Sequence, residues 1–143
     1  MKIKYLILLL PLMITGCFFG EVGSGIITKT CTRQTIINDI TLIEEKVIKQ
    51  KDNQILSIVV NNKIVGDTNV TFRSLKNSYL SEVNNLKSLG IVINTNEDIK
   101  NEYSVSYELD FNTLSDELKR KYEFEELYHN QIKKYENDGY NCK

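Results

Sequence analysis

The chain has 143 residues, which is a typical length for one domain. Its apolar fraction of 41% and charged fraction of 26% are those of a globular protein and exclude a disordered one. The formal net charge is −1 and no basic patch is visible, so we expect no nucleic-acid partner.

The first residues are typical of a secretory signal. Lys2 and Lys4 form a basic start, and an almost continuous apolar run follows from Tyr5 to Ile14. Small residues then precede a cysteine, in the order Ile14-Thr15-Gly16-Cys17. An uncleaved transmembrane anchor is the alternative. It is disfavoured because the apolar stretch is shorter than the roughly 20 residues that a spanning helix needs.

Cys17 resembles the lipidated cysteine of the bacterial lipobox. This resemblance implies that its thiolate takes a diacylglycerol and that a peptidase cuts between Gly16 and Cys17. We therefore expect a signal peptide at residues 1–16 that forms a helix, a lipidated cysteine with a flexible tether at 17–25, and one α+β domain at 26–143. The expected location is the extracytoplasmic face of the cell membrane, with membrane lipid bound through acylated Cys17.

Two further cysteines, Cys31 and Cys142, lie near the two ends of the expected domain. Export would place them in an oxidising compartment, where a disulfide between them is expected. It would close a loop of about 110 residues and contribute on the order of 4–5 kcal/mol in the chain-entropy model. Two free buried thiols are the alternative. A metal site is disfavoured because His129 is the only histidine and no CxxC spacing occurs.

In residues 26–64 the side chains alternate with the period of two that is typical of β-strands. Turn signals at Asn38-Asp39 and at Lys51-Asp52-Asn53 divide them into three strands, which predicts a β-meander. Glu44, Glu45 and Lys46 interrupt the apolar pattern of the second strand.

A helix is predicted after Gly66, with Asp67 or Thr68 as its N-cap and Gly90 just beyond its end. Its apolar face follows helical spacing and comprises Phe72, Leu75, Tyr79, Val83 and Leu86. The opposite face carries Arg73, Lys76, Asn77, Glu82 and Asn84.

The remaining elements are two strands and a last helix. We expect a short strand at 91–93, a turn at 94–98 and a strictly alternating strand from Tyr103 to Phe111. Ser115 is expected to cap a short helical turn. The last helix presents one apolar side (Phe124, Leu127, Tyr128, Ile132 and Tyr135) and ends at Gly139 before the chain returns toward the first strand. The fold class is thus α+β, with an antiparallel sheet and two helices packed on one face.

These features together resemble the YehR-like small bacterial lipoproteins. The resemblance is carried by the lipobox at Cys17, the threonine-rich segment 28–33, the helix closing at Leu89-Gly90, and the C-terminal Gly-Tyr-Asn-Cys-Lys at 139–143. It implies a fold and a location, but no biochemical activity.

No constellation in the sequence has the spacing of a catalytic, metal or cofactor motif. His129 lies beside the apolar side of the last helix, and the acidic residues Asp116, Glu117, Glu123, Glu125 and Glu126 are typical of a solvated surface. We therefore predict no catalytic residue, no metal and no cofactor. The leading hypothesis is a non-enzymatic domain that binds an envelope protein or a small ligand. A hydrolase using a carboxylate pair and a purely structural envelope component are the alternatives.

Overall fold

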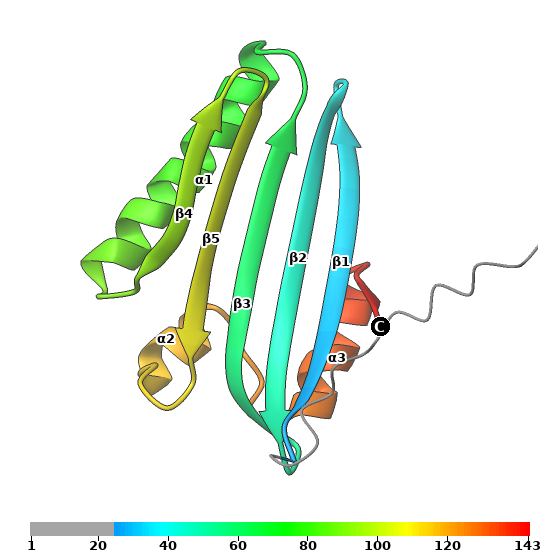
Figure 1. Cartoon of the computed structure of the whole chain (residues 1–143), viewed down its shortest axis with the longest axis vertical. Coiled ribbons are helices and arrows are strands. Elements are labelled where there is room, and N and C mark those ends of the chain that lie inside the picture. Colours follow the sequence, from blue (N-terminus) through cyan, green and yellow to red (C-terminus); the bar gives the residue numbers. More distant parts are fainter. Residues whose placement is uncertain (1–24) are drawn as a thin grey trace, which may run out of the picture.

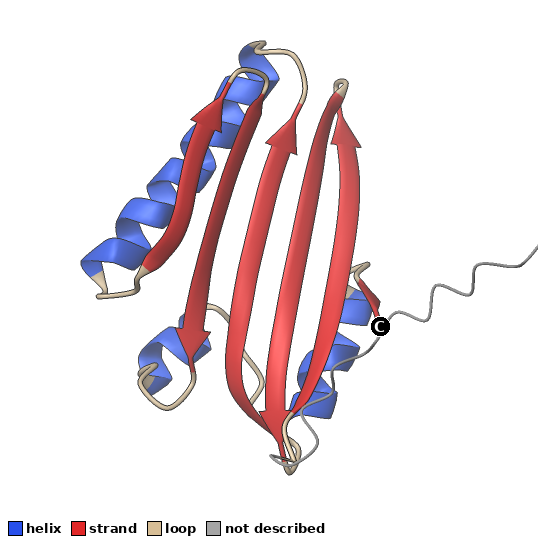
Figure 2. Cartoon of the chain, in the orientation of Figure 1, coloured by secondary structure: helices blue, strands red, loops and turns tan. Residues whose placement is uncertain are grey.

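The computed structural model describes residues 25–143, which form a six-stranded antiparallel sheet with three helices (Figures 1 and 2). The predicted class and the antiparallel sheet are therefore confirmed. The signal helix predicted for residues 1–16 lies outside the described residues, as does nearly all of the 17–25 tether.

Three long strands form the predicted meander: β1 (Ile27–Ile37), β2 (Ile40–Lys51) and β3 (Gln54–Val65). Asn38 and Asp39 link the first pair, and Asp52 and Asn53 link the second. All four have positive φ, the backbone of two-residue hairpin turns that asparagine and aspartate adopt readily. The sheet is completed by β4 (Ile93–Ile99), β5 (Glu102–Asp110) and β6 (Asn141–Cys142), in the order β4-β5-β3-β2-β1-β6.

The strand at β4 corrects the prediction for residues 91–98. The segment predicted as a turn is strand, and the actual turn lies at Lys100 and Asn101, where Asn101 has a φ of 63°. Most of β4 is exposed, so its residues lack the alternating pattern that marks a half-buried strand. Only its pairing with β5 makes it a strand.

The long helix α1 (Val70–Ser88) begins one residue later than predicted. Asn69 is its N-cap in place of Asp67 or Thr68, and the Asn69 side chain accepts a hydrogen bond from the Phe72 amide. Gly90 has a φ of +81°, the left-handed conformation expected just after a helix.

Two shorter helices follow, so the described chain has one helix more than the two that the sequence predicted. Ser115 caps α2 (Asp116–Lys121) as expected. The last helix, α3 (Tyr128–Asn137), starts later than predicted because Leu127 bridges Gln54 at the start of β3.

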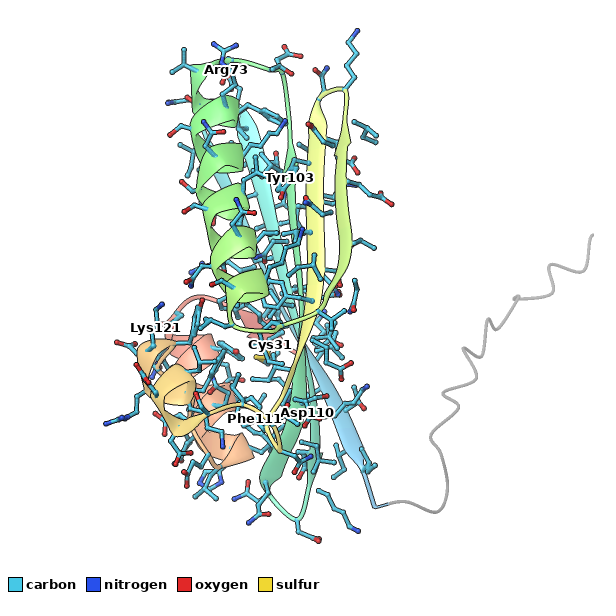
Figure 3. The ribbon with its side chains drawn as sticks, turned by 90° about the vertical axis from the view of Figure 1, so that its left-hand side faces the viewer. Cys31, Arg73, Tyr103, Asp110, Phe111 and Lys121 are labelled. Carbon is cyan, nitrogen blue, oxygen red and sulfur yellow. A yellow bond between two sulfur atoms is a disulfide. The ribbon has the colours of Figure 1, made fainter. Side chains whose placement is uncertain are left out.

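All three helices pack against one face of the sheet (Figure 3). The apolar alternation of β5 places Tyr103, Val105, Tyr107 and Leu109 in the core on this side. The opposite face carries no helix (Figure 1). The sheet therefore presents one covered face and one open face.

Candidate functional site: a charged cluster on the covered face

Charged side chains lie among the core residues of the covered face. Arg33, Glu44 and Asn62 are direct partners across β1, β2 and β3, and they continue the row of buried Val105. The next row contains Cys31, Lys46 and Val60. Directly paired residues point to the same face of a sheet. These ionisable groups therefore share the helix-covered side with the core.

Glu44 is held by two neighbours. Arg33 donates from Nε to Glu44 Oε2 at 2.8 Å, and its Nη2 lies 2.7 Å from the same oxygen. The Tyr140 hydroxyl lies 3.3 Å from Oε1. Only 15% of the Glu44 side chain is exposed. Both carboxylate oxygens therefore have a donor, and Glu44 is largely removed from solvent while Arg33 is part-exposed.

Arg33 also connects the sheet to the end of α3. Its Nη1 donates to the Asp138 carbonyl at 2.8 Å, and its guanidinium lies 4.6 Å from the centre of the Tyr140 ring. Burial, followed by the charge of Glu44, raises the pKa of the Tyr140 hydroxyl well above its usual value. Tyr140 therefore stays protonated and can donate to Glu44.

A second acidic group reaches the cluster from α1. The Tyr107 hydroxyl donates to Glu82 Oε1 at 2.8 Å. Burial and the nearby charge of Glu82 raise the pKa of Tyr107 far above its usual range. Sequence analysis placed Glu82 on the outer face of this helix. That assignment is wrong, because the Tyr107 hydroxyl draws the carboxylate to the sheet side.

Lys46 is under the electrostatic influence of both carboxylates. Burial lowers the pKa of Lys46, while the charges of Glu44 and Glu82 raise it in opposition. Within residues 25–143 no acceptor lies at hydrogen-bond or ion-pair distance from Lys46 Nζ. The side chain is half-buried. A half-buried ammonium without a direct partner is uncommon because its desolvation is only partly compensated.

Tyr79 of α1 completes the group. Burial first, and then the charges of Glu44 and Glu82, raise the pKa of Tyr79 to about 12. Its ring is half-buried, and its hydroxyl forms no hydrogen bond within the described chain. We call the whole set the Lys46 cluster. It comprises Arg33, Glu44, Lys46, Tyr79, Glu82, Tyr107 and Tyr140.

A further polar group lies beside the cluster. Asn62 is 4% exposed, and its Oδ1 accepts no hydrogen bond from the described residues. Buried polar atoms are nearly always paired, so those that are not mark places with a special role. Asn62 Oδ1 and Lys46 Nζ thus leave an acceptor and a donor on the same face of the sheet.

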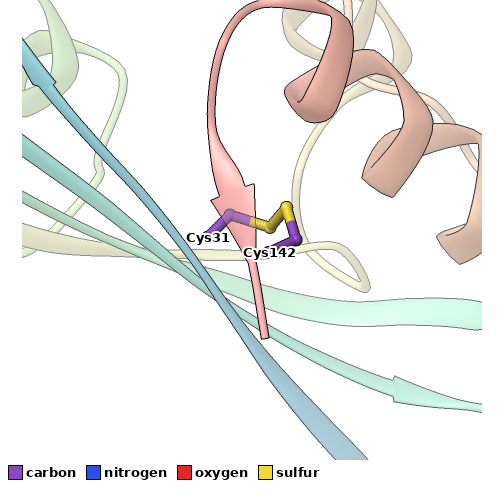
Figure 4. Close-up of a disulfide and its surroundings, with 2 residues drawn as sticks. All are labelled: Cys31 and Cys142. Carbon is purple, nitrogen blue, oxygen red and sulfur yellow. A yellow bond between two sulfur atoms is a disulfide. The ribbon is translucent and has the colours of Figure 1, made fainter.

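The two predicted disulfide residues lie next to this cluster. Cys31 and Cys142 are joined by a disulfide and are direct partners in β1 and β6 (Figure 4). Thr30 and Lys143 exchange two backbone hydrogen bonds beside them. Because Cys31 also pairs with Lys46 on β2, the disulfide holds β6 and the adjacent Tyr140 against the cluster.

The other residues singled out in the sequence do not join the cluster. His129 Nδ1 lies 2.9 Å from Asn53 Oδ1, which ties the start of α3 to the β2–β3 turn. Glu123 pairs with Lys134, and Asp116 pairs with Lys119 on the outside of α2. No group of three or more potential metal ligands occurs in residues 25–143. Gly16 and Cys17 lie outside the described residues.

The open face is shallow and carries apolar as well as polar side chains. Two hollows lie along β5, with volumes of about 280 and 420 Å³. Ser57 and Lys49 bond to Glu108 there, and Asn61 bonds to Glu45. No tyrosine lines either hollow. The tyrosines of β5, Tyr103 and Tyr107, are instead buried on the covered side.

Sequence reasoning missed the residues that form the cluster. The signal that marks them is the interruption of an apolar strand by Glu44 and Lys46, two positions apart and hence on one face. Glu82 had no comparable signal, because it follows the helical spacing of a solvated residue.

No protein-family model, curated protein or solved structure matches this chain. Among the helices of residues 25–143, none has the length and hydropathy needed to cross a membrane.

Proposed function

We propose that this chain is a lipid-anchored binding domain on the extracytoplasmic face of a bacterial membrane, tethered through Cys17, and that the Lys46 cluster is its ligand site. The resemblance to the YehR-like lipoproteins is part of this proposal. The observation that carries the binding site is the half-buried Lys46 ammonium. Its strand neighbours place it on the covered face, two carboxylates act on it electrostatically, and no acceptor in the described chain engages it.

Several features of the cluster favour binding over catalysis. Glu44 has a donor on each oxygen, and Glu82 accepts from Tyr107. A general acid or base needs a carboxylate that can exchange a proton with its substrate. The hydrogen bonds here hold both carboxylates in place, as suits a preorganised binding site.

The binding site is tested by thermal unfolding of the mature chain in detergent micelles. The ligand panel comprises amino acids, dipeptides, neutral sugars, inorganic phosphate and a fatty acid. A ligand at ten times its Kd adds about 1.4 kcal/mol, which raises Tm by about 5 °C in a domain of this size. We expect one class of ligand in the panel to raise Tm by this amount, and we expect the Lys46→Met variant to show no such rise.

Lys49→Met is the matched control, because Lys49 lies on the same strand but faces the open side and pairs with Glu108. Its response to the panel should equal that of the wild type. The assignment of the site is wrong if no ligand raises the Tm of the wild type. It is also wrong if a ligand raises the Tm of the wild type and of Lys46→Met equally.

The anchor is tested separately. Intact mass of the membrane-extracted protein should lack residues 1–16 and carry acyl mass. A Cys17→Ser variant should leave the membrane fraction. A full-length, unacylated mass would refute the anchor without bearing on the ligand site.

A further inference from the structure

We infer that the Lys46 cluster recognises a zwitterion, that is, a ligand presenting a carboxylate to Lys46 and an ammonium to Glu82, as the ends of a free amino acid or a short peptide do. This inference rests on the proposed function and names the ligand class of the same site.

The charge balance of the cluster favours a ligand with no net charge over a simple ion. Arg33 and Lys46 supply two positive charges, and Glu44 and Glu82 supply two negative ones. The tyrosines are neutral because their pKa values are raised. An added anion would face Glu44 and Glu82 without compensation, and an added cation would face Arg33 and Lys46. A zwitterion adds both charges and leaves the balance unchanged.

The groups with unused hydrogen-bonding capacity are also one cation and one anion. Lys46 Nζ carries three donors, and the described chain satisfies none of them. Glu82 uses Oε1 for Tyr107, and its second oxygen has no donor among the described residues. Charge-assisted hydrogen bonds are the strong ones, so these two groups set the preference for a carboxylate and an ammonium.

Lys46 and Glu82 come from different elements, so a ligand that contacts both has to span the distance between them. Lys46 lies on β2, whereas Tyr107, which holds Glu82, lies on β5 two strands away. That separation is about 10 Å at the backbone, and Lys46 and Tyr107 lie in one row with Val60 on the helix-covered face. Tyr79, on the same helix as Glu82, supplies a half-buried ring with an unused hydroxyl.

Four related ligands test the inference by isothermal titration calorimetry on the mature chain in micelles. They are L-alanine, N-acetyl-L-alanine, L-alanine amide and L-alanyl-L-alanine. Alanine or its dipeptide should bind, and the acetyl and amide forms should each bind roughly 10- to 100-fold more weakly, as expected for the loss of one hydrogen bond to a charged group. Whichever of alanine and the dipeptide binds more tightly identifies the source of the zwitterion.

Two variants assign the ends of the ligand. Lys46→Met should lower affinity for alanine or the dipeptide roughly 10- to 100-fold but leave the weak binding of the amide unchanged. Glu82→Gln should lower affinity for alanine or the dipeptide by a similar factor but leave the weak binding of the acetyl form unchanged. Lys49→Met should match the wild type. The control for folding is thermal unfolding, which should be cooperative for each variant.

The outcomes separate the two proposals. If the acetyl form binds as tightly as alanine, the site takes an anion, and the inference is wrong while the binding function stands. If none of the four ligands binds at millimolar concentration but another class in the thermal panel does, the inference again fails alone. If no ligand binds in either experiment, both the binding function and the zwitterion inference are wrong.

Discussion

The two faces of this sheet both carry charges from β2, yet the surroundings of these charges differ. On the open face, Lys49 pairs with Glu108, and their side chains are 46% and 41% exposed. On the covered face, Arg33 and Glu44 are 35% and 15% exposed, and Lys46 has no direct partner in the described chain. Exposed pairs contribute little to stability, because water screens them. Partly buried charges are costly when uncompensated, so those on the covered face require another reason to be there.

The largest effect on the covered face should come from the disulfide, which holds Tyr140 beside Glu44. Reduction of Cys31–Cys142 should lower the free energy of unfolding by about 4 kcal/mol, because it releases a loop of more than 100 residues. Urea unfolding with and without a phosphine reductant measures this. A Cys31→Ala/Cys142→Ala variant should not respond to the reductant, and equal midpoints for the wild type would contradict the prediction.

The next effect compares one carboxylate on each face. Glu44→Gln should cost about 2 kcal/mol, a value below that of a fully buried pair because Arg33 is part-exposed. Glu108→Gln on the open face should cost less than about 0.5 kcal/mol. Urea denaturation of both variants at pH 7 measures the difference. Equal losses would show that the two faces do not differ as described.

Lys46→Met should stabilise the domain by about 1 kcal/mol, since it removes a half-buried charge without removing a bonded partner. The folded-state pKa of Lys46 lies below its ordinary value of 10.5. The unfolded chain therefore binds this proton more tightly, and wild-type stability rises as pH increases through the folded pKa toward 10.5. The advantage of the variant should shrink over that window.

Lys49→Met is the comparison for this effect and should stay within about 0.5 kcal/mol of the wild type. A destabilised Lys46→Met would mean that Lys46 supports the fold. A stabilised variant that loses ligand is the pattern of a residue kept for function at the expense of stability.

The smallest effect concerns Glu108 on the open face. The hydrogen bond from Ser57 is the largest effect and lowers the pKa of Glu108. Burial, second in size, opposes it, and the charge of Lys49 adds to the lowering, so the pKa lies below its ordinary value. Its contribution is therefore present above the unfolded pKa and is lost as pH falls through the folded pKa. Ser57→Ala should raise the Glu108 pKa in an NMR titration. An unchanged pKa would show that Ser57 does not act on this carboxylate.

The sequence predicted well the elements whose signals are local. The hairpin turns at 38–39 and 52–53 were correct because asparagine and aspartate tolerate positive φ. The helix end at Gly90 was correct for the same reason. Most of β4 was predicted as a turn, because an exposed edge strand has no buried face to show in its pattern.

The candidate site was predicted less well. The disulfide followed from the cysteine count, but Glu82 was assigned to solvent because helical spacing alone could not reveal the Tyr107 hydroxyl opposite it. Tyr107 lies 25 residues away in the chain. Contacts at that separation depend on packing, which a single sequence does not record.

The sequence by itself determined the hairpins, the amphipathic helix, the alternation of β5 and the cysteine pair, because each depends on backbone preferences, on burial periodicity or on the number of thiols available. The tertiary structure alone decided that Arg33, Glu44, Lys46 and Glu82 meet on the covered face. Strand register places the first three there, and a buried hydroxyl draws in the fourth. Their charges balance only because three separate segments of chain, β1, β2 and α1, are packed together.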